Sequence, residues 1–530
     1  MAAAPSKPPA SLTPTPSSPR AFWWRSALPA LGCGAVAALG FAPLSWFPLT
    51  LLGLAALFTF WSTCTRRRDA VLTGFFFGLG FFLVGVSWVF VSLYTYGHMP
   101  LLLAALATFL FCAYLALFPA MAGWIVAKSS RQPMFKLILL GPAAFVATEW
   151  LRGWLFTGFP WLAIGYTQAP GGWLAGFAPV GGVYAVSWLL AISAGLIALL
   201  WHFRRDRSMP LKAITFALLA VIWVGGALLQ RIELSQPYGE PVKVALLQGN
   251  VPQDVKWEAG SRAAMLEQYR QMALKSDARI VVFPETALPM FADQIPREYL
   301  RSLLEHADAR RVDFLLGSVE RGSDGSNGGA FDYYNSVISF GTGKRQSYRK
   351  THLVPFGEFI PLGFKWVLNV LKIPLTDFAS GGTDQKPLDI AGQRVAANIC
   401  YEDAFGEEII RQLPAATLMV NVSNVAWFGK SWAADQHFQM SQMRSIETSR
   451  WMLRATNTGV TGAIDEKGRA VAVLPQFTTD TLIVAAQGRR GTTPYVVVGN
   501  WPILGVLAAA LGLAFAPLLR LSRGRSSTVK

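Results

Sequence analysis

The spacing of apolar residues divides the chain into two parts. From residue 24 to residue 230, and again close to the C-terminus, apolar runs near or above the length that a helix needs to cross a bilayer follow one another. The pattern predicts eight spans, at about residues 24–42, 47–64, 70–96, 100–127, 135–155, 174–201, 211–230 and 500–519. Between residues 240 and 490 short β-rich segments alternate with helical ones, which predicts an α/β domain with a sheet covered by helices.

Within this second part the predicted elements are short and regular. Strands are predicted at residues 242–248, 279–285, 313–319, 335–340, 394–400 and 417–423, and helices near residues 263–277, 295–310 and 432–454. No P-loop and no GxGxxG sequence opens any of these helices, so nucleotide binding has little support.

Composition and charge favour a membrane protein. The chain is 52% hydrophobic and only 15% charged, with a mean hydropathy of +0.36, whereas soluble domains are typically about 25% charged. The net charge of +16 is concentrated in short clusters between apolar runs, which predicts membrane orientation and no nucleic-acid partner. The clusters are Arg25; Arg66 to Arg68; Lys128, Arg131 and Lys136; Arg204, Arg205 and Arg207; and Arg520, Arg523, Arg525 and Lys530.

The positive-inside rule turns these clusters into a topology, because basic loops stay in the cytoplasm. We expect both termini to be cytoplasmic and the α/β domain to lie on the far side. The predicted divisions are a disordered tail (1–22), a seven-span membrane domain (23–231), the α/β domain (240–490), an eighth span (499–520) and a C-terminal tail (521–530). Glu149 and Arg152, at the end of the fifth span, are either functional or a mutual ion pair.

The candidate nucleophile is Cys400, at the tip of the predicted strand RVAANIC. The other three cysteines fall within apolar runs, so Cys400 has no obvious disulfide partner. A buried structural thiol is the alternative. The five histidines are scattered, without HExxH or Cys/His pairing, so neither a metal site nor a cofactor is expected.

Two further residues complete a plausible chemistry. A thiol near neutral pH needs an adjacent base or cation to act as a nucleophile. Glu285, ending the strand VVFPE, would accept and return the proton, and Lys350, in YRKTHLVPFGE, would stabilise a developing oxyanion. Glu358, eight residues after Lys350, would orient the lysine or share the proton.

At these motifs the chain resembles a known family. VVFPET, YRKTHLVPFGE and NICYED are similar to the Glu-Lys-Cys signature of the nitrilase superfamily. With the spans, and with HLVPFGEF, NVSNVAWFGKS and HFQMSQMRSIE, the whole resembles the apolipoprotein N-acyltransferase family. The resemblance implies an α-β-β-α sandwich with catalytic Glu285, Lys350 and Cys400. Supporting residues implied in the same way are Glu358, Tyr401, Glu402, Trp257, Asn335, Trp427 and Phe428.

The resemblance also implies a reaction and its setting. A phospholipid would acylate Cys400, and the thioester would pass its chain to the N-terminal amine of the diacylglyceryl-cysteine of an apolipoprotein. The enzyme would be a monomer of the bacterial inner membrane, with its catalytic domain in the periplasm. The alternatives are a membrane-tethered amidase acting on a small amide, and a transporter or scaffold carrying an inactive domain.

Two segments are interpreted from their own residues. The stretch after Glu358, FIPLGFKWVLNVLKIPLTDFASGG, predicts an amphipathic arm resting on the bilayer, with a buried core helix as the alternative. His437 and Arg444, on the predicted helix 432–454, are assigned to packing and ion pairing.

Overall fold

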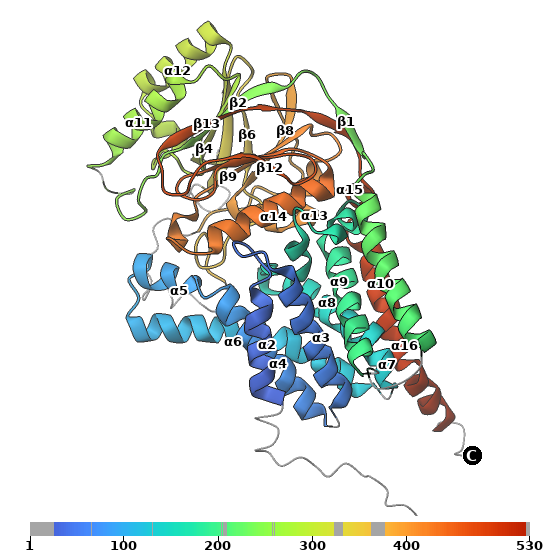
Figure 1. Cartoon of the computed structure of the whole chain (residues 1–530). Helices are drawn as coiled ribbons and strands as arrows, with labels where there is room; N and C mark the ends of the chain where they lie inside the picture. Colours follow the sequence, from blue (N-terminus) through green and yellow to red (C-terminus); the bar gives the residue numbers. More distant parts are fainter. Residues whose placement is uncertain are drawn as a thin grey trace, which may run out of the picture.

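The structure is a computed structural model, and it places an α/β domain on a bundle of apolar helices (Figure 1). It describes residues 26–64, 66–129, 131–202, 204, 209–256, 258, 260–322, 332–361 and 377–525. The predicted disordered tail, Trp257 and most of the predicted amphipathic arm lie outside these residues.

The bundle is built from long apolar helices, as the hydrophobic pattern predicts. They are α2 (Leu28–Ala38), α3 (Phe47–Thr63), α4 (Arg67–Gly85), α6 (Leu101–Lys128), α8 (Gly141–Arg152) with the preceding turns α7 (Pro133–Phe135) and η3 (Lys136–Leu140), α9 (Ala178–His202), α10 (Met209–Leu229) and α16 (Trp501–Arg525). Among the described residues, 5 helical segments are long and apolar enough to cross a membrane, and three shorter apolar helices accompany them. Several membrane-type helices are therefore confirmed, but the number eight is not.

The predicted third span, 70–96, is wrong as one continuous helix. α4 ends at Gly85, and the short helices α5 (Val89–Val91) and η2 (Ser92–Tyr96) lean sideways from the bundle (Figure 1). Trp88 explains the break, because its indole Nε1 donates to Gly85 O (3.1 Å) and to Gln436 Oε1 of the α/β domain (3.0 Å). A buried indole N–H needs an acceptor, and here a side chain from the other domain supplies one.

The α/β domain consists of two six-stranded sheets and a two-stranded ribbon. The first sheet has the order β13-β2-β3-β4-β5-β6 and the second β12-β11-β10-β9-β8-β7, while β1 pairs with β14 where the chain enters and leaves the domain. The strands are β1 (Ser235–Pro237), β2 (Val242–Gln248), β3 (Ile280–Val282), β4 (Asp313–Arg321), β5 (Tyr333–Gly341), β6 (Gln346–Arg349), β7 (Leu388–Ile390), β8 (Gln393–Ile399), β9 (Leu418–Ser423), β10 (Met452–Thr456), β11 (Gly462–Ile464), β12 (Ala470–Val473), β13 (Asp480–Ala486) and β14 (Arg489–Gly491).

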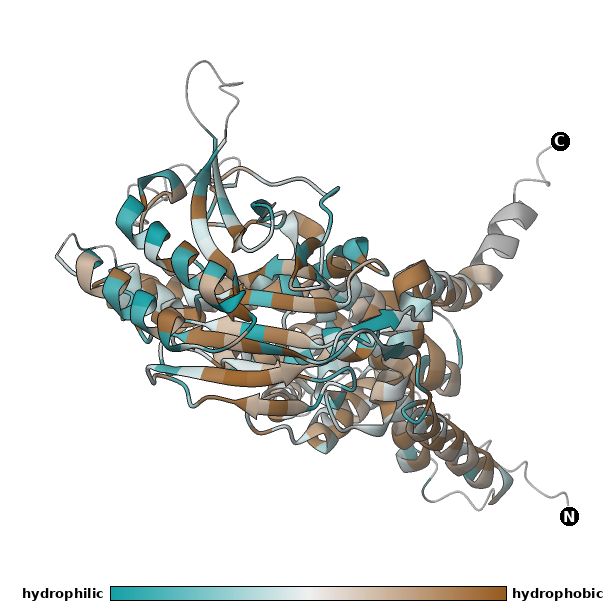
Figure 2. Ribbon diagram, turned by 90° about the horizontal axis from the view of Figure 1, so that it is seen from above, coloured by the Kyte–Doolittle hydropathy of each residue, from teal (hydrophilic) through white to brown (hydrophobic). Residues whose placement is uncertain are grey.

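The two sheets pack face to face and helices cover their outer faces, which confirms the predicted α-β-β-α sandwich. Val244 and Leu315 of one sheet meet Val395 and Val420 of the other in one buried apolar cluster. Helices α11 (Arg262–Lys275) and α12 (Arg297–Arg310) cover the first sheet, and their outer faces are largely hydrophilic (Figure 2). Helix α14 (Ala433–Thr448) covers the second sheet.

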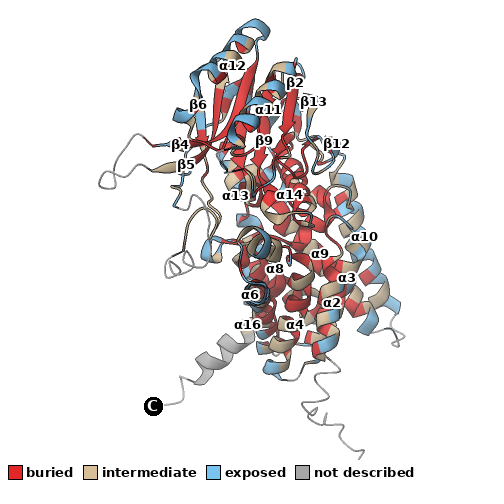
Figure 3. Ribbon diagram, turned by 90° about the vertical axis from the view of Figure 1, so that its left-hand side faces the viewer, coloured by how far each residue is buried: buried red, intermediate tan, exposed pale blue. Residues whose placement is uncertain are grey.

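Helix α14 lies between the two domains and is buried on all sides (Figure 3). Its side chains Met440 and Met443 join the core of the membrane bundle, while Ala434 and Phe438 pack on the sheet. The predicted helix 432–454 was therefore too long at its C-terminal end. Ser449 turns into the left-handed region (φ 52°), and the chain continues as the central strand β10, because a sheet position outweighs local helix propensity.

Small residues let the membrane helices approach closely. A Cβ added to Gly34 in α2 would lie 1.9 Å from the Phe77 carbonyl oxygen of α4, and one on Gly80 would lie 2.0 Å from Leu31 O. Helices in lipid associate through such close backbone contact. Gly32, also in α2, is exposed, and a Cβ added there would have nothing within 4 Å.

We therefore expect Gly34→Ala to lower the stability of the bundle by about 1–3 kcal/mol, since the new methyl group overpacks the α2–α4 contact. Gly32→Ala is the matched control in the same helix and should be neutral or slightly stabilising. The measurement is the thermal unfolding midpoint in detergent. Equal midpoints for the two variants would show that the α2–α4 approach does not stabilise the bundle.

Candidate active site

Three predicted site residues follow the ends of three strands. Glu285 comes after β3, Lys350 directly after β6, and Cys400 directly after β8. β3 and β6 belong to the first sheet and β8 to the second, so the site lies where the two sheets meet. Polar residues at strand ends project beyond the apolar core, and this is where a sandwich can hold charged groups without disrupting its interior.

The centre of the site is the ammonium group of Lys350. Its Nζ lies 2.9 Å from Glu358 Oε1 and 3.6 Å from Glu285 Oε1, and the residue is only 1% exposed. Asn335, on β5, donates through Nδ2 to the same two oxygens, at 2.7 Å from Glu285 and 2.8 Å from Glu358. Four of the predicted residues therefore form one contiguous cluster.

Both carboxylates are also held by backbone N–H groups through their second oxygens. Asn424 N donates to Glu285 Oε2 and Val354 N donates to Glu358 Oε2, each at 2.8 Å. Hydrogen bonds to ionised carboxylates are short and strong. The two acids thus have fixed orientations toward Lys350.

The two carboxylates keep the lysine charged. Burial disfavours the ammonium form, but the negative charges of Glu358 and Glu285 outweigh this effect and raise the pKa of Lys350 above its usual value. A cation held this way can stabilise negative charge that develops nearby.

Cys400 adopts a backbone conformation that side-chain-bearing residues rarely take, with φ of 51°. It begins the short helix η9 (Cys400–Ala404), and its carbonyl oxygen accepts hydrogen bonds from Asn421 Nδ2 and His437 Nε2, both at 3.1 Å. Strained backbone persists only when its surroundings hold it, and it is common at functional sites. These two bonds hold the turn that presents the thiol.

The thiol of Cys400 is protonated at neutral pH. Burial and the negative charge of Glu285 raise its pKa to about 12, and Lys350 only partly opposes them. An S–H of this kind needs a base at hand when it reacts. Glu285, which is itself buried, is the carboxylate with the largest effect on the thiol.

Among the described residues, Glu402 makes no hydrogen bond to Lys350, Glu285, Glu358 or Asn335. Its Oε1 accepts hydrogen bonds from Tyr348 OH (2.9 Å) and Thr351 N (2.6 Å), and its Oε2 accepts one from Ile399 N (2.6 Å). Burial raises the pKa of Glu402 to about 7. The side chain ties the loop after β6 to the end of β8, and it thereby fixes Lys350 relative to Cys400.

The predicted aromatic residues face the membrane domain. Tyr401 donates to Gly158 O (3.0 Å) and stacks on Trp161 at 6.3 Å between ring centroids. Phe428 packs against Trp88 at 4.6 Å and Trp427 against Tyr96 at 6.3 Å. These side chains join the catalytic loops to the helices beneath them.

A buried charged network beneath Cys400 was not predicted from the sequence. Asp403 accepts hydrogen bonds from His437 Nε2 and Arg454 Nη1, both at 2.6 Å, and from Ser441 Oγ. Arg454 Nη2 also donates to His437 Nδ1 (2.7 Å). Burial and Arg454 lower the pKa of His437, so the ring stays neutral and its Nε2–H can reach Cys400 O. The prediction of ion pairing is confirmed for Arg444, whose Nη2 lies 3.0 Å from Glu447 Oε1, whereas His437 makes a neutral hydrogen bond to Asp403, and the prediction missed its contact with Cys400. The motif NICYED contained the only signal, an acid three residues after the cysteine.

Within the described residues, no group of three or more His, Cys, Asp or Glu side chains is arranged to hold a metal ion.

Comparisons with known proteins extend over nearly the whole chain. Residues 33–196 match the apolipoprotein N-acyltransferase N-terminal domain family, and residues 243–495 match the carbon-nitrogen hydrolase family. The chain is 50% identical over 490 residues to apolipoprotein N-acyltransferase of Nitrosomonas europaea, covering 92% of this chain and 96% of the relative. For the proteins of the same name from Methylococcus capsulatus and Ralstonia nicotianae the identities are 45% (93% of this chain, 96% of the relative) and 43% (90% and 91%).

The raised pKa of Cys400 predicts how the rate of thiol alkylation depends on pH. The charges of Lys350 and Glu285 should change that rate in opposite directions. Alkylation by iodoacetamide should accelerate about tenfold per pH unit between pH 7 and pH 10, because the thiolate fraction rises that way below the pKa. Lys350→Met should slow alkylation at each pH, since losing the cation raises the thiol pKa further. Glu285→Gln should accelerate it, because removing the anion lowers that pKa. Peptide mass spectrometry of the alkylated chain measures all three rates. A plateau near pH 8, or the same direction of change in both variants, would contradict this electrostatic account.

Proposed function

Because the chain belongs to the apolipoprotein N-acyltransferase family, we propose that it acylates the N-terminal amine of the diacylglyceryl-cysteine of lipoproteins, with a phospholipid as acyl donor and a thioester on Cys400 as intermediate. Full-length similarity to enzymes of that name supports the activity. The observation that carries the residue assignment is the buried cluster of Lys350 with Glu285 and Glu358 beside Cys400.

In the first half-reaction the Cys400 thiol gives its proton to Glu285, and Sγ attacks the ester carbonyl carbon of the phospholipid. Negative charge then develops on the carbonyl oxygen, and the ammonium of Lys350 stabilises it. The ester C–O bond breaks, the lysophospholipid oxygen leaves with the proton from Glu285, and an acyl thioester remains on Cys400.

In the second half-reaction the acceptor amine attacks the thioester carbonyl. Glu285 takes a proton from the amine nitrogen, the C–S bond breaks, and the thiolate of Cys400 recovers a proton from Glu285. The products are an amide and the free thiol. Glu358 and Asn335 hold Lys350 and Glu285 in position through both steps, which makes them positioning residues.

We further propose that all eight apolar helices span the inner membrane, with the catalytic domain periplasmic and both termini cytoplasmic. The loops that join α3 to α4, α6 to α7 and α9 to α10 lie on the side away from the α/β domain (Figure 1), and their described residues include the basic Arg66, Arg131 and Arg204. Exposed tryptophans support two interfaces. Trp46, Trp154, Trp173 and Trp501 are exposed at helix ends near the catalytic domain, and Trp124 and Trp201 at the opposite ends. Arg131, which follows α6, donates to Leu513 O near the distal part of α16 (2.7 Å).

One chain supplies every residue assigned to the reaction, so we propose that it acts as a monomer. Hydrolysis of a small amide, the alternative from the sequence, is not favoured. Residues 243–495 match the carbon-nitrogen hydrolase family, but residues 33–196 match a domain of N-acyltransferases. Acyl transfer also requires that water be held off the thioester. The aromatic contacts of Tyr401 and Phe428 against the membrane domain are consistent with such a shielded site.

The test is intact mass spectrometry of the purified chain after exposure to a phospholipid with a labelled acyl chain, and again after addition of a diacylated lipopeptide. We expect a mass increase of one acyl group, located on Cys400, which disappears as the lipopeptide gains the label. Cys400→Ala should show no adduct.

Glu285→Gln is the informative control, because it should lose acylation while its thiol remains open to alkylation. A labelled adduct in Cys400→Ala, or acylation at the unmodified rate in Glu285→Gln, would overturn the assignment of nucleophile or base.

A further inference from the structure

Two charged residues of the membrane domain are buried where it meets the α/β domain. Glu149 and Arg152, at the end of α8, are 4% and 3% exposed. A mutual ion pair was one expectation from the sequence, but each of the two binds backbone atoms of residues 158–166, the junction loop, instead. Ionisable side chains inside a membrane domain are costly, and they usually mark a function.

The contacts of the two residues fix the path of the junction loop. Arg152 Nη1 donates to Phe159 O (2.6 Å) and to Trp161 O (2.5 Å). Glu149 Oε1 accepts from Ile164 N (2.7 Å). Buried backbone groups outside regular helices and sheets need partners from elsewhere, above all in a membrane protein. The guanidinium and the carboxylate therefore satisfy and orient three backbone groups of this loop.

The backbone of the junction loop is strained, so it depends on such anchors. Gly158 has a φ of 85° and Leu162 a φ of 58°. A residue with a bulky side chain keeps a left-handed conformation only when its surroundings hold it. A Cβ added to Gly158 would lie 2.1 Å from Gly153 O, because the loop folds back onto the end of α8. Removing its buried anchors should therefore let the loop relax.

The junction loop in turn holds the short helix η9, which begins at Cys400. Gly158 O accepts a hydrogen bond from Tyr401 OH (3.0 Å). Tyr166 OH donates to Ala404 O (3.2 Å). Because Tyr401 is the second residue of η9 and Ala404 the last, the loop binds this helix near both of its ends.

Trp161 connects the junction loop to the groups that surround Cys400. Its ring stacks on Tyr401 with 6.3 Å between centroids, and it lies 5.4 Å from the imidazole ring of His437. Its Nε1 donates to Gln436 Oε1 (2.7 Å). His437 is the residue whose Nε2 holds the carbonyl oxygen of Cys400. One side chain of the membrane domain thus contacts both the neighbour of Cys400 in the sequence and the imidazole that binds its carbonyl.

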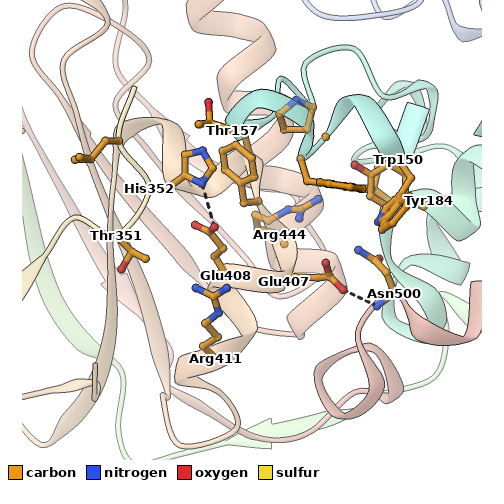
Figure 4. A pocket seen from close by; sticks show the side chains of 18 of the residues that line it. Trp150, Thr157, Tyr184, Thr351, His352, Glu407, Glu408, Arg411, Arg444 and Asn500 are labelled. Atoms are coloured by element: carbon orange, nitrogen blue, oxygen red, sulfur yellow. Dashed lines mark hydrogen bonds and ion pairs between the residues drawn. The ribbon is translucent and has the colours of Figure 1, made fainter. Parts of the chain in front are cut away.

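The α/β domain holds the junction loop from the other side. Arg444 Nη2 donates to Tyr166 OH (3.4 Å) and to Glu447 Oε1 (3.0 Å). Figure 4 shows this guanidinium in the wall of a cavity of about 540 Å³, to which Thr157 and Pro160 of the membrane domain also belong. The loop is therefore bound both by the end of α8 and by α14.

We propose that Glu149 and Arg152 are positioning residues for the reaction at Cys400. By binding the backbone of the junction loop they fix its side chains Trp161 and Tyr166, and these hold η9 with the thiol that it carries. The inference rests on the proposed function, because acylation of Cys400 is the reaction whose rate it concerns. It makes the membrane domain a part of the active site as well as its anchor.

The first test is the rate at which dioleoyl phosphatidylethanolamine in mixed detergent micelles acylates Cys400. Glu149→Ala removes the acceptor of Ile164 N, and at saturating lipid it should slow acylation about tenfold to a hundredfold, because misplaced reacting atoms react slowly. The lipid concentration needed for the half-maximal rate should change by less than about twofold, since no lipid contact is removed. Glu149→Gln, whose amide oxygen can still accept from Ile164 N, should keep a rate within about threefold of the unmodified one.

Arg152→Met tests the second anchor, and Thr148→Val is the matched control. The methionine keeps an unbranched apolar side chain but lacks both donated hydrogen bonds, so acylation should again slow about tenfold to a hundredfold. Thr148 precedes Glu149 in α8 and is equally buried, but its Oγ1 donates to Phe145 O of its own helix (2.9 Å). Thr148→Val should leave the rate of acylation unchanged.

Hydrogen exchange followed by mass spectrometry tests the positioning without any lipid. Peptides that cover residues 398–408 should exchange faster in Glu149→Ala and in Arg152→Met, because η9 loses its support. Peptides from α12 should exchange as they do in the unmodified chain. Glu149→Gln should retain the protection of residues 398–408.

The outcomes separate this inference from the proposed function. If the unmodified chain forms no adduct with the phospholipid, the proposed function fails, and hydrogen exchange still decides whether the two residues hold η9. If the adduct forms, but Glu149→Ala and Arg152→Met match the unmodified chain in rate and exchange, only the inference is wrong. If Glu149→Gln is as slow as Glu149→Ala, the charge matters and not the bond to Ile164 N, which overturns the positioning role.

Tyr166→Phe keeps the test decisive if the variants at the two buried charges do not fold. It removes only the hydroxyl group that reaches Ala404 O, and it should slow acylation about threefold to tenfold, as expected for one lost hydrogen bond. Residues 398–408 should also exchange faster. An unmodified rate together with unmodified exchange in Tyr166→Phe would show that the junction loop does not hold η9, and would overturn the inference.

Discussion

The site depends on one buried positive charge shared by two carboxylates, of which Glu285 is buried and Glu358 is partly buried. An ammonium without partners would be strongly disfavoured inside the protein, and so would either carboxylate. Lys350, Glu285 and Glu358 satisfy one another, and Asn335 bridges the two acids. Because Lys350 and Glu358 come from the segment after β6 and Glu285 comes from the segment after β3, their mutual attraction fixes these two segments relative to one another. The oxyanion-stabilising cation and the base are thus positioned by the same interaction.

Cys400 is positioned from the opposite side, through helix α14. His437 holds the carbonyl of Cys400, and the preceding residue, Gln436, accepts hydrogen bonds from Trp88 (3.0 Å) and Trp161 (2.7 Å) of the membrane domain. One short stretch of helix therefore contacts both the reactive turn and the place where α4 ends. A change in the packing of the membrane helices would reach the turn that carries the thiol through these two adjacent side chains.

The local hydrophobic pattern predicted most of the helices and strands, and the resemblance of the motifs to a known family predicted which polar residues form the candidate site. The β-rich segment VKVALLQ matches β2 (Val242–Gln248) to the residue, because a strand buried on both faces has a nearly continuous apolar run. The break after Gly85 and the end of α14 were missed, since both depend on partners far along the chain, Gln436 for Trp88 and the neighbouring strands for β10. The Asp403 network was missed for the same reason, because its partners His437, Ser441 and Arg454 lie far along the chain and only the acid in NICYED pointed to it.

The most direct test of the central claim is a double-mutant cycle on the charge cluster, read as the thermal unfolding midpoint in detergent. Lys350→Met leaves two facing carboxylates, and Glu358→Gln leaves the lysine with a single weaker partner. If the three residues stabilise one another, each single substitution should lower the free energy of unfolding. The loss in the double variant should then be smaller than the sum of the two single losses by about 1–3 kcal/mol. Additive effects of the two substitutions would contradict the account, because they would mean that Lys350 and Glu358 do not depend on one another.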